Sequence, residues 1–243
     1  MTEASIKPRA RKQKVKKPEF HCEFCSVSFT RESSLLVHVC EKKRRLLDKD
    51  SKHVRIGFQV YQKFWSYSYP YSKNKEKTYS EFINFAEYGA FTAFGKYLVD
   101  IRAINPMKFV EFLLKTNIKL KDWKKEEVYL TYIRELSKTE TPDAAIERNI
   151  LLMQQWANDN DCNWIDFFRK ISPSAAVQFI KGGRISPWAI YTTDSGQEMM
   201  GRFSDEQIEL VRKYIEPEFW VLKFKRNKED FDNFREILSE AGL

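Results

Sequence analysis

The fold of the first part of this chain is decided by one stretch, Phe20-His-Cys-Glu-Phe-Cys-Ser-Val-Ser-Phe-Thr-Arg-Glu-Ser-Ser-Leu-Leu-Val-His-Val-Cys40. Cys22 and Cys25 are separated by two residues, and two thiolates at this spacing can hold one side of a zinc ion. His38 comes after twelve further residues, and Cys40 follows it after one. The sequence therefore predicts a site for Zn²⁺ with Cys22, Cys25, His38 and Cys40 as its ligands.

The soft metal ligands are concentrated near the start of the chain. All three histidines (His21, His38 and His53) and three of the four cysteines lie within the first 53 residues. Disulfide-bonded or simply buried thiols are the alternative interpretation. Four cysteines are few for 243 residues, and Cys162 would be left over from a framework in the first part of the chain. We expect Cys162 to be a small buried side chain.

This stretch resembles a C2H2-type zinc finger, in a C2HC variant, over residues 20–40. Phe29 follows Cys25 by four positions and Leu35 precedes the histidine by three, where that family places the two apolar residues of its small core. Phe20 matches the family's usual aromatic residue before the first cysteine. The resemblance implies two short strands and a helix (ββα-like) around the metal.

The fourth ligand departs from the family's pattern, which places it three to five residues beyond the first histidine. Residues i and i+2 of an α-helix point about 200° apart. We therefore expect the helix to open or tighten at His38 if Cys40 binds the metal. His53, Glu41 and His21 are the alternative fourth ligands, and the softness of a thiolate favours Cys40.

The positive charge of the chain is unevenly distributed. The net charge is +8, and residues 1–55 hold fifteen Lys or Arg against seven Asp or Glu, whereas residues 56–243 hold 27 of each. The excess flanks the predicted finger, with Lys7, Arg9, Arg11, Lys12, Lys14, Lys16 and Lys17 before it and Lys42, Lys43, Arg44 and Arg45 after it. Such flanks suit a nucleic acid, because each neutralised phosphate releases counterions. A solvated tail without a partner is the alternative.

The resemblance also implies which residues would face the major groove of DNA: Arg31, Ser33, Ser34 and Val37. Arg31 can pair with a guanine, whereas the two serines discriminate little between bases. We therefore expect low sequence specificity, with the basic flanks supplying most of the affinity, and we favour DNA over RNA. A finger that contacts protein is the alternative.

The chain beyond residue 50 has the composition of a globular helical body. Helix starts are indicated by a capping residue before proline at Asn105-Pro106, Thr141-Pro142, Ser172-Pro173 and Ser186-Pro187, and by capping boxes at Thr78/Glu81 and Ser204/Gln207. The segment Phe219–Phe224 is the best strand candidate. We predict a mainly α fold, in which a small zinc finger is joined by a helix to a larger multi-helix body.

The expected domain plan has four parts. Residues 1–18 form a basic disordered arm and residues 19–45 the zinc finger. Residues 46–77 form a connecting helix and loop, with one helix running from Arg44 to Phe64. Residues 78–243 form the mainly helical globular domain.

A glycine-containing loop, Lys181-Gly182-Gly183-Arg184, precedes the predicted helix start at Ser186. The free N–H groups of that helix, with the two cationic side chains, could bind a phosphate. The alternative, which we favour, is a tight turn with a glycine at the end of a helix.

Three classes of function remain open. The leading hypothesis is a non-enzymatic nucleic-acid-binding protein whose helical body is an effector or assembly module in transcription or replication, and whose body could also bind a protein partner. The second is a protein-interaction adaptor. The third is a carboxylate-dependent nucleic-acid enzyme. We disfavour enzymatic activity in general, because no histidine beyond His53 provides the usual general base and the acid pairs of the body are also typical of helix starts and solvated surface. Reduced thiols indicate an intracellular protein (cytoplasm or nucleoid, or the nucleus of a eukaryote), and no apolar run is long enough to cross a membrane.

Overall fold

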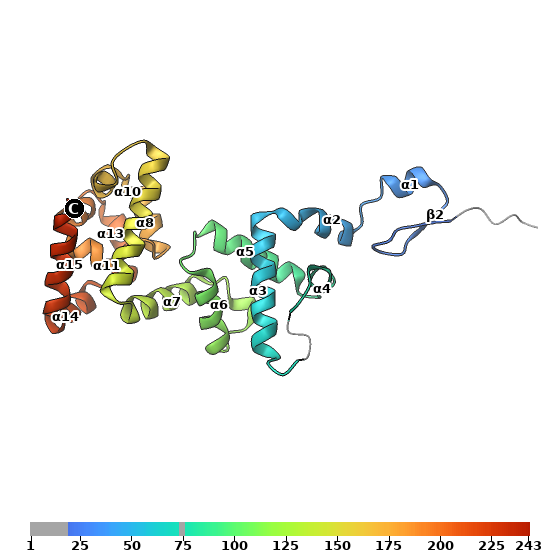
Figure 1. Cartoon of the computed structure of the whole chain (residues 1–243), viewed down its shortest axis with the longest axis horizontal. Coiled ribbons are helices and arrows are strands. Elements are labelled where there is room, and N and C mark those ends of the chain that lie inside the picture. The colour runs from blue at the N-terminus through green and yellow to red at the C-terminus, as the bar shows by residue number, and fades with distance from the viewer. Residues whose placement is uncertain (1–18, 73–75) are drawn as a thin grey trace, which may run out of the picture. The chain divides into compact units, whose positions relative to one another are not determined.

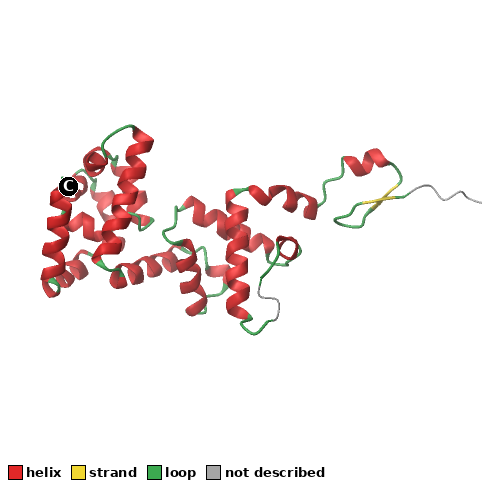
Figure 2. Ribbon diagram, in the orientation of Figure 1, coloured by secondary structure: helices red, strands yellow, loops and turns green. Residues whose placement is uncertain are grey.

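The computed structural model describes residues 19–72 and 76–243 (Figure 1). The chain divides into two compact units, Met1–Lys49 and Asp50–Leu243, which are called here the N-terminal unit and the body. The predicted basic arm, residues 1–18, lies outside the described residues, and the finer division at residues 45 and 77 stays a prediction. The described residues are mainly helical, with one pair of very short strands (Figure 2).

The described part of the N-terminal unit, from residue 19 on, contains two strands and two short helices. Its elements are β1 (Phe20–His21), β2 (Ser28–Phe29), α1 (Glu32–Leu36) and α2 (Glu41–Leu47), followed by the 3₁₀ turn η1 (Asp48–Asp50). The strands are antiparallel, with Phe20 opposite Phe29. The ring of Phe29 lies 4.8 Å from the ring of His38, centroid to centroid. This arrangement is the expected small ββα-like fold.

The helix of this unit opens at His38, as the spacing of the ligands requires. Helix α1 ends at Leu36, and His38 and Val39 are not helical. Cys40 then takes an extended backbone conformation as the N-cap of α2. Two helices therefore replace the single helix of the finger family, and the last predicted ligand stands at the start of the second.

The body is built from two helical lobes. The first lobe comprises α3 (Lys52–Ser68), α4 (Tyr79–Ile83), α5 (Tyr88–Asp100), α6 (Pro106–Lys115), η2 (Leu120–Asp122) and α7 (Glu126–Thr139). Its core is rich in aromatic side chains, and Phe82, Phe91, Phe94, Phe109 and Trp123 are almost completely buried.

Helices α3 and α5 of the first lobe pack backbone against backbone. A Cβ atom on Gly57 would lie 2.8 Å from the carbonyl oxygen of Phe91, and one on Gly95 would overlap the carbonyl oxygen of His53. Glycine is therefore required at both positions, because any side chain would push the two helices apart.

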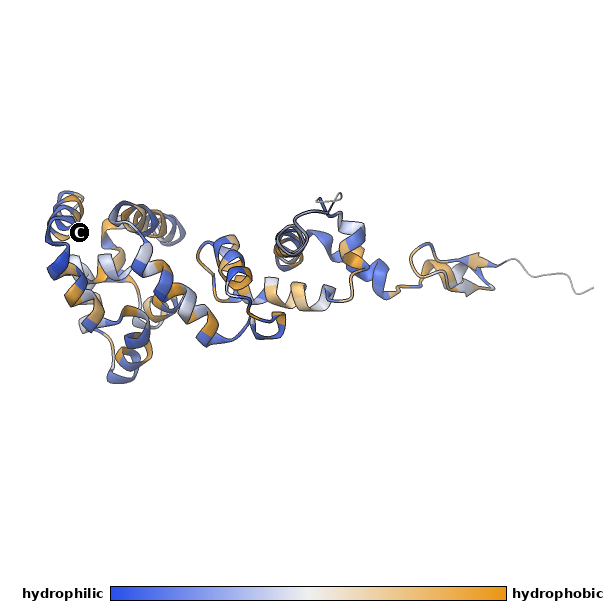
Figure 3. Cartoon of the chain, turned by 90° about the horizontal axis from the view of Figure 1, so that it is seen from below, coloured by the Kyte–Doolittle hydropathy of each residue, from blue (hydrophilic) through white to orange (hydrophobic). Residues whose placement is uncertain are grey.

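The second lobe follows α7 in the chain (Figure 1). It comprises α8 (Pro142–Asn160), η3 (Trp164–Asp166), α9 (Phe167–Lys170), α10 (Pro173–Lys181), α11 (Pro187–Thr192), α12 (Asp194–Gly201), α13 (Asp205–Ile215), α14 (Pro217–Arg226) and α15 (Lys228–Glu240). Hydrophobic and hydrophilic residues alternate along its helices, as amphipathic packing requires (Figure 3). Its apolar faces meet in two clusters, one of which is centred on Trp188 and Trp220.

The predicted helix starts in the body are confirmed. Helices α6, α8, α10 and α11 each begin at the proline, and α4 and α13 each begin with a complete capping box. The hydroxyl groups of Thr141, Ser172 and Ser186 accept a backbone N–H of the first turn. Asn105 adopts a left-handed conformation instead, and its side chain makes no cap.

Two local predictions are wrong. The strand expected at Phe219–Phe224 is part of helix α14. Trp220 is buried, at 1% exposure, whereas Leu222 is 53% exposed, although a strand would place both side chains on one face. Pro217, two residues before this segment, was the missed signal for a helix start.

The single helix expected from Arg44 to Phe64 is also wrong. Helix α2 ends at Leu47, the turn η1 follows, and Ser51 is the N-cap of α3. Aspartate and serine side chains compete with a helix for backbone hydrogen bonds, so Asp48-Lys-Asp-Ser51 favours a break.

Candidate metal centre

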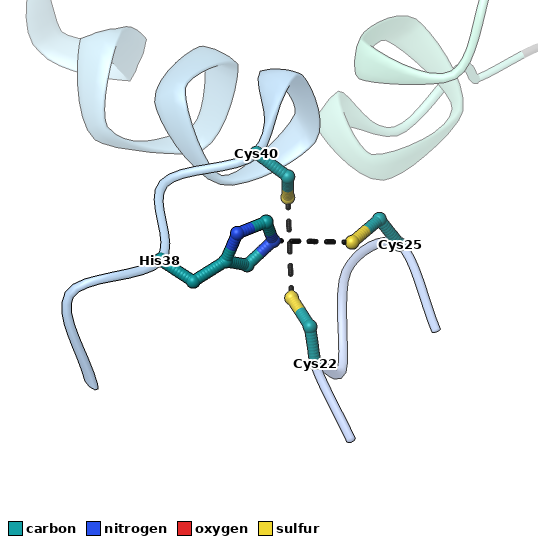
Figure 4. Close-up of side chains that lie close together, drawn as sticks. All are labelled: Cys22, Cys25, His38 and Cys40. Carbon is teal, nitrogen blue, oxygen red and sulfur yellow. Dashed lines mark hydrogen bonds between the residues drawn. The ribbon is translucent and has the colours of Figure 1, made fainter. Parts of the chain in front are cut away.

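Four side chains of the N-terminal unit converge on one point (Figure 4). They are Cys22, Cys25, His38 and Cys40, and their ligand atoms all lie within 4.8 Å of one another. The turn between the strands positions the first two, because the N–H of Cys22 donates to Val27 (3.0 Å) and the carbonyl oxygen of Cys22 accepts from Ser26 (2.8 Å). These four residues form a group that can hold a metal ion.

Two separations between ligand atoms are close to the edges of a tetrahedral site. The Sγ atoms of Cys22 and Cys40 are 4.0 Å apart, and Sγ of Cys25 is 3.3 Å from Nε2 of His38. With a metal–sulfur distance of about 2.3 Å and a metal–nitrogen distance of about 2.0 Å, a tetrahedron has edges of about 3.8 Å between two sulfurs and about 3.5 Å between sulfur and nitrogen. The two observed edges differ from these values by only a few tenths of an ångström.

The thiol groups are in an environment that suits a cation. Burial raises the pKa of Cys22, but hydrogen bonds from the backbone of Phe24 and Cys25 outweigh it, and the pKa lies below its ordinary value. For Cys25, a backbone hydrogen bond from Val27 lowers the pKa, but burial and the neighbouring thiols outweigh it and leave the pKa raised. Several thiolates this close repel one another, so a bound cation is needed for all of them to ionise.

Cys40 links the site to helix α2. Its Sγ accepts a hydrogen bond from the backbone N–H of Lys43 at 3.4 Å, which makes the thiol the cap of this helix. The ammonium group of Lys43 in turn donates to the carbonyl oxygen of His38 at 3.3 Å. A negatively charged thiolate is favoured at a helix N-terminus, where the free N–H groups carry partial positive charge.

The alternative fourth ligands lie outside this group. His21 shares a hydrogen bond with the hydroxyl of Ser28 at 3.0 Å, and Glu41 is paired with Arg45. His53 belongs to helix α3 of the body. The geometry therefore favours Cys40 over each of them.

The residues predicted to contact nucleic acid occupy two elements of this unit. Arg31 precedes α1 and is exposed, as is Ser33, whereas Ser34 is half-buried. Helix α2 carries Lys42 and Arg44, which are exposed, and Lys43 and Arg45, which are half-buried. The predicted contacts Lys12, Lys14, Lys16 and Lys17 lie outside the described residues. Because the four cations of α2 are consecutive, they surround the helix rather than forming one stripe.

An exposed apolar surface adjoins the site, and the sequence interpretation anticipated only one of its residues. Leu36, Val37 and Val39 are 72%, 79% and 58% exposed. Val37 was expected to face a groove of DNA, but its two neighbours were given no role. The run Leu-Leu-Val-His-Val was a usable signal, since so small a unit cannot bury that many apolar side chains.

The loop Lys181–Arg184 forms a turn between α10 and α11. The backbone N–H groups from Gly182 to Ser186 all donate to acceptors of the protein itself. Gly183 has a φ of +72°, and a Cβ atom there would collide with Cδ1 of Ile133 in the first lobe. Any phosphate at this loop would therefore depend on the side chains of Lys181 and Arg184.

No helix among the described residues is both long enough and apolar enough to cross a membrane. No family model, no curated protein and no solved structure matches the chain.

Proposed function

We propose that the N-terminal unit is a zinc-stabilised, nucleic-acid-binding module of the C2HC type. Three thiolates and one imidazole are a typical ligand set of structural zinc sites. Cys22, Cys25, His38 and Cys40 would hold the ion, and four protein ligands leave no open coordination position for a reacting molecule. Zinc would therefore stabilise the fold of this unit rather than take part in a reaction.

The observation that carries the proposal is the double role of Cys40, which is both a ligand of the candidate site and the cap of the cationic helix α2. A helix of seven residues is not stable by itself in water. Anchoring its first turn to a metal-bound thiolate stabilises it and holds Lys42 and Arg44 in a defined position. Metal binding would thus also fix the position of the positive charges on α2.

The charge distribution supports contacts with phosphates rather than with base edges. The cations of α2 surround the helix, and seven more Lys or Arg precede β1 in the sequence. Phosphate contacts provide affinity and orientation without sequence information. We therefore propose duplex DNA as the principal target, bound with low sequence specificity, and the body as an effector or assembly module in transcription or replication.

The proposal is tested with the full chain by measuring bound zinc and the affinity for duplex DNA at several salt concentrations. We expect one zinc per chain and an affinity that falls steeply as salt is added. Cys22→Ser should lose the zinc and weaken DNA binding, whereas Cys162→Ser, which alters a cysteine outside the site, should change neither. A zinc content near zero, or DNA binding that is unaffected by Cys22→Ser, would contradict the proposal. A comparison with RNA decides between the two nucleic acids.

A second candidate function is a finger that contacts protein, and the exposed apolar residues Leu36, Val37 and Val39 favour it. The two functions predict different effects of substitutions on DNA binding. Lys42→Gln combined with Arg44→Gln should weaken DNA binding if the module binds nucleic acid, whereas Val37→Ser should leave it unchanged. Insensitivity of DNA binding to the double variant would favour the protein-contacting function.

A further inference from the structure

The body contains a cavity of about 900 Å³. It is lined by residues of α3, α5, the turn after α5 and the start of α6 in the first lobe, and of α8, α10 and the turn after α10 in the second. The side chains that matter most to its chemistry are Lys52, Arg102, Trp156, Asp159, Phe179 and Arg184. The volume is within the range of small-molecule and cofactor sites.

Two arginines of the lining lie beside the same aromatic ring, that of Phe179. The guanidinium carbon of Arg184 lies 4.9 Å from the centroid of the Phe179 ring, and that of Arg102 lies 5.7 Å from it. Arg184 also donates a hydrogen bond to Oε1 of Gln155 at 3.0 Å. Within residues 19–72 and 76–243, neither arginine has a carboxylate partner. Burial and the charge of Arg102 both lower the pKa of Arg184.

A nearby arginine with a structural role, Arg148, offers a comparison for Arg102 and Arg184. Arg148 is paired with Glu140 and also donates to the carbonyl oxygens of Gly183 and Arg184. The pair Arg102 and Arg184 has no such neutralising carboxylate, and Lys52 adds a third cation to the lining. Asp159 is the one carboxylate among the residues that line this cavity. The net charge of the lining is therefore positive.

The backbone at Arg102 is set by the end of helix α5. Its φ is +50°, a left-handed conformation directly after the end of α5. Glycine adopts this conformation without steric cost, and asparagine tolerates it better than a long side chain does. The N–H of Arg102 donates to Val99 and that of Ala103 to Leu98, which is a common way of ending a helix, so the end of α5 fixes where the Arg102 side chain begins.

We infer that this cavity binds a nucleotide, with its phosphate on Arg102 and Arg184 and its base against Trp156 and the apolar wall. Two guanidinium groups can bind a phosphate through several charge-assisted hydrogen bonds. The aromatic and apolar residues of the lining match the face of a planar base. A free nucleotide and the terminal nucleotide of a single strand share this chemistry. The inference is independent of the zinc module and adds a binding function to the body.

The test is isothermal titration calorimetry of the full chain with adenosine 5′-monophosphate. We expect saturable binding, with adenosine alone and inorganic phosphate alone each at least about tenfold weaker, since each makes only part of the contacts. A 5′-phosphorylated tetranucleotide distinguishes a site for free nucleotides from a site for the end of a single strand. Tighter binding of the tetranucleotide assigns the site to strand ends, and equal or weaker binding assigns it to free nucleotides. The absence of binding at millimolar adenosine 5′-monophosphate would overturn the inference.

Variants make the test specific to the two arginines. Arg184→Gln and Arg102→Gly should each weaken nucleotide binding by about tenfold or more, as expected for loss of a hydrogen bond between charged groups. Arg102→Gly should also raise the melting temperature, because glycine relieves the left-handed backbone. A residue with a purely structural role would not combine higher stability with weaker binding.

Three further variants control for general charge effects. Asp159→Asn should tighten nucleotide binding about two- to threefold, because it removes the opposing charge. Arg235→Gln, at an exposed position on α15, removes the same charge elsewhere and should have no effect. Cys22→Ser should leave nucleotide binding unchanged, which separates this site from the zinc module. Equal affinities of the wild-type protein and both arginine variants would refute the inference.

Discussion

The N-terminal unit and the body are stabilised in different ways. Among the described residues of the N-terminal unit, Cys22 is the one buried side chain, and large apolar residues such as Leu36 and Leu47 are exposed. The body instead buries three clusters of hydrophobic residues, many of them aromatic. The short unit is centred on a group of ligands, whereas the long one is centred on apolar cores.

The difference follows from chain length. A few tens of residues expose most of their surface, so burial alone does not offset the loss of conformational entropy on folding. A metal site replaces the missing core, because its binding free energy also contributes to folding. The body is long enough to fold around hydrophobic cores without a metal site. Substitutions or metal removal in one unit should therefore leave the stability of the other unit unchanged.

Metal removal should produce the largest difference in stability between the N-terminal unit and the body. A chelator, or Cys22→Ser, should unfold residues 19–49, because structural zinc contributes on the order of 10 kcal/mol to the folding of small modules. Hydrogen exchange followed by mass spectrometry should show loss of protection in peptides of the N-terminal unit and none in peptides of the body. Cys162→Ser should change neither. Loss of protection in both units would mean that they do not fold independently.

A substitution in the body core should give the reverse pattern. Trp188 is 1% exposed and packs against Trp220, Phe224 and Phe234. Trp188→Ala should lower the free energy of unfolding of the body by about 3–5 kcal/mol, measured by urea denaturation, while the zinc content stays unchanged.

Phenylalanine at the same position is the matched control. The indole Nε1 of Trp188 has no hydrogen-bond partner among the described residues. Trp188→Phe therefore removes no hydrogen bond and keeps an aromatic ring, so it should cost clearly less than Trp188→Ala. Equal losses for the two variants would show that the size of the side chain does not determine the stability of this core.

The contact between the two lobes of the body should be sensitive to a single methyl group. Gly183→Ala should destabilise the body by about 2 kcal/mol, because φ is positive there and the new Cβ would collide with Ile133. Gly89, in helix α5, has no atom within 4 Å of the position of a Cβ. Gly89→Ala should stabilise the body by up to about 1 kcal/mol, measured by urea denaturation. Changes of the same sign would contradict the proposed contact.

The smallest expected effect concerns acid stability. The hydroxyl of Tyr214 (2.7 Å) and the ammonium of Lys213 (3.0 Å) donate to Oε1 of Glu126 and lower its pKa from 4.5 to about 2. Because the pKa is lower in the folded state, this contribution is present above about pH 4.5 and is lost as the pH falls towards 2. The side chain is half exposed, so the contribution is below about 1 kcal/mol.

The acid effect is measured by urea denaturation of the body across this pH range. Glu126→Gln should flatten the decline in stability at low pH. Glu127→Gln, at an exposed neighbouring position, should leave the decline unchanged. An unchanged decline in Glu126→Gln would show that the contacts with Tyr214 and Lys213 do not stabilise the fold.

The sequence by itself determined the features that depend on neighbours within a few residues. The capping boxes at Thr78 and Ser204 are each complete within four residues, so their geometry follows from local backbone hydrogen bonds. The same holds for the cysteine pair Cys22 and Cys25, which a short turn brings together. The opening of the helix at His38 could also be predicted, because a regular helix cannot direct residues i and i+2 to one point.

Only the tertiary structure decided the features that depend on distant neighbours. The periodicity of Phe219–Phe224 was compatible with a strand until packing against Trp188 showed a helix. The capping role of Cys40 became visible only with the position of α2. Arg102 and Arg184 are remote in sequence, and their approach at Phe179 depends on the packing of two lobes. Local patterns carry no information about such contacts, because long-range packing selects among conformations that local preferences leave nearly equal in energy.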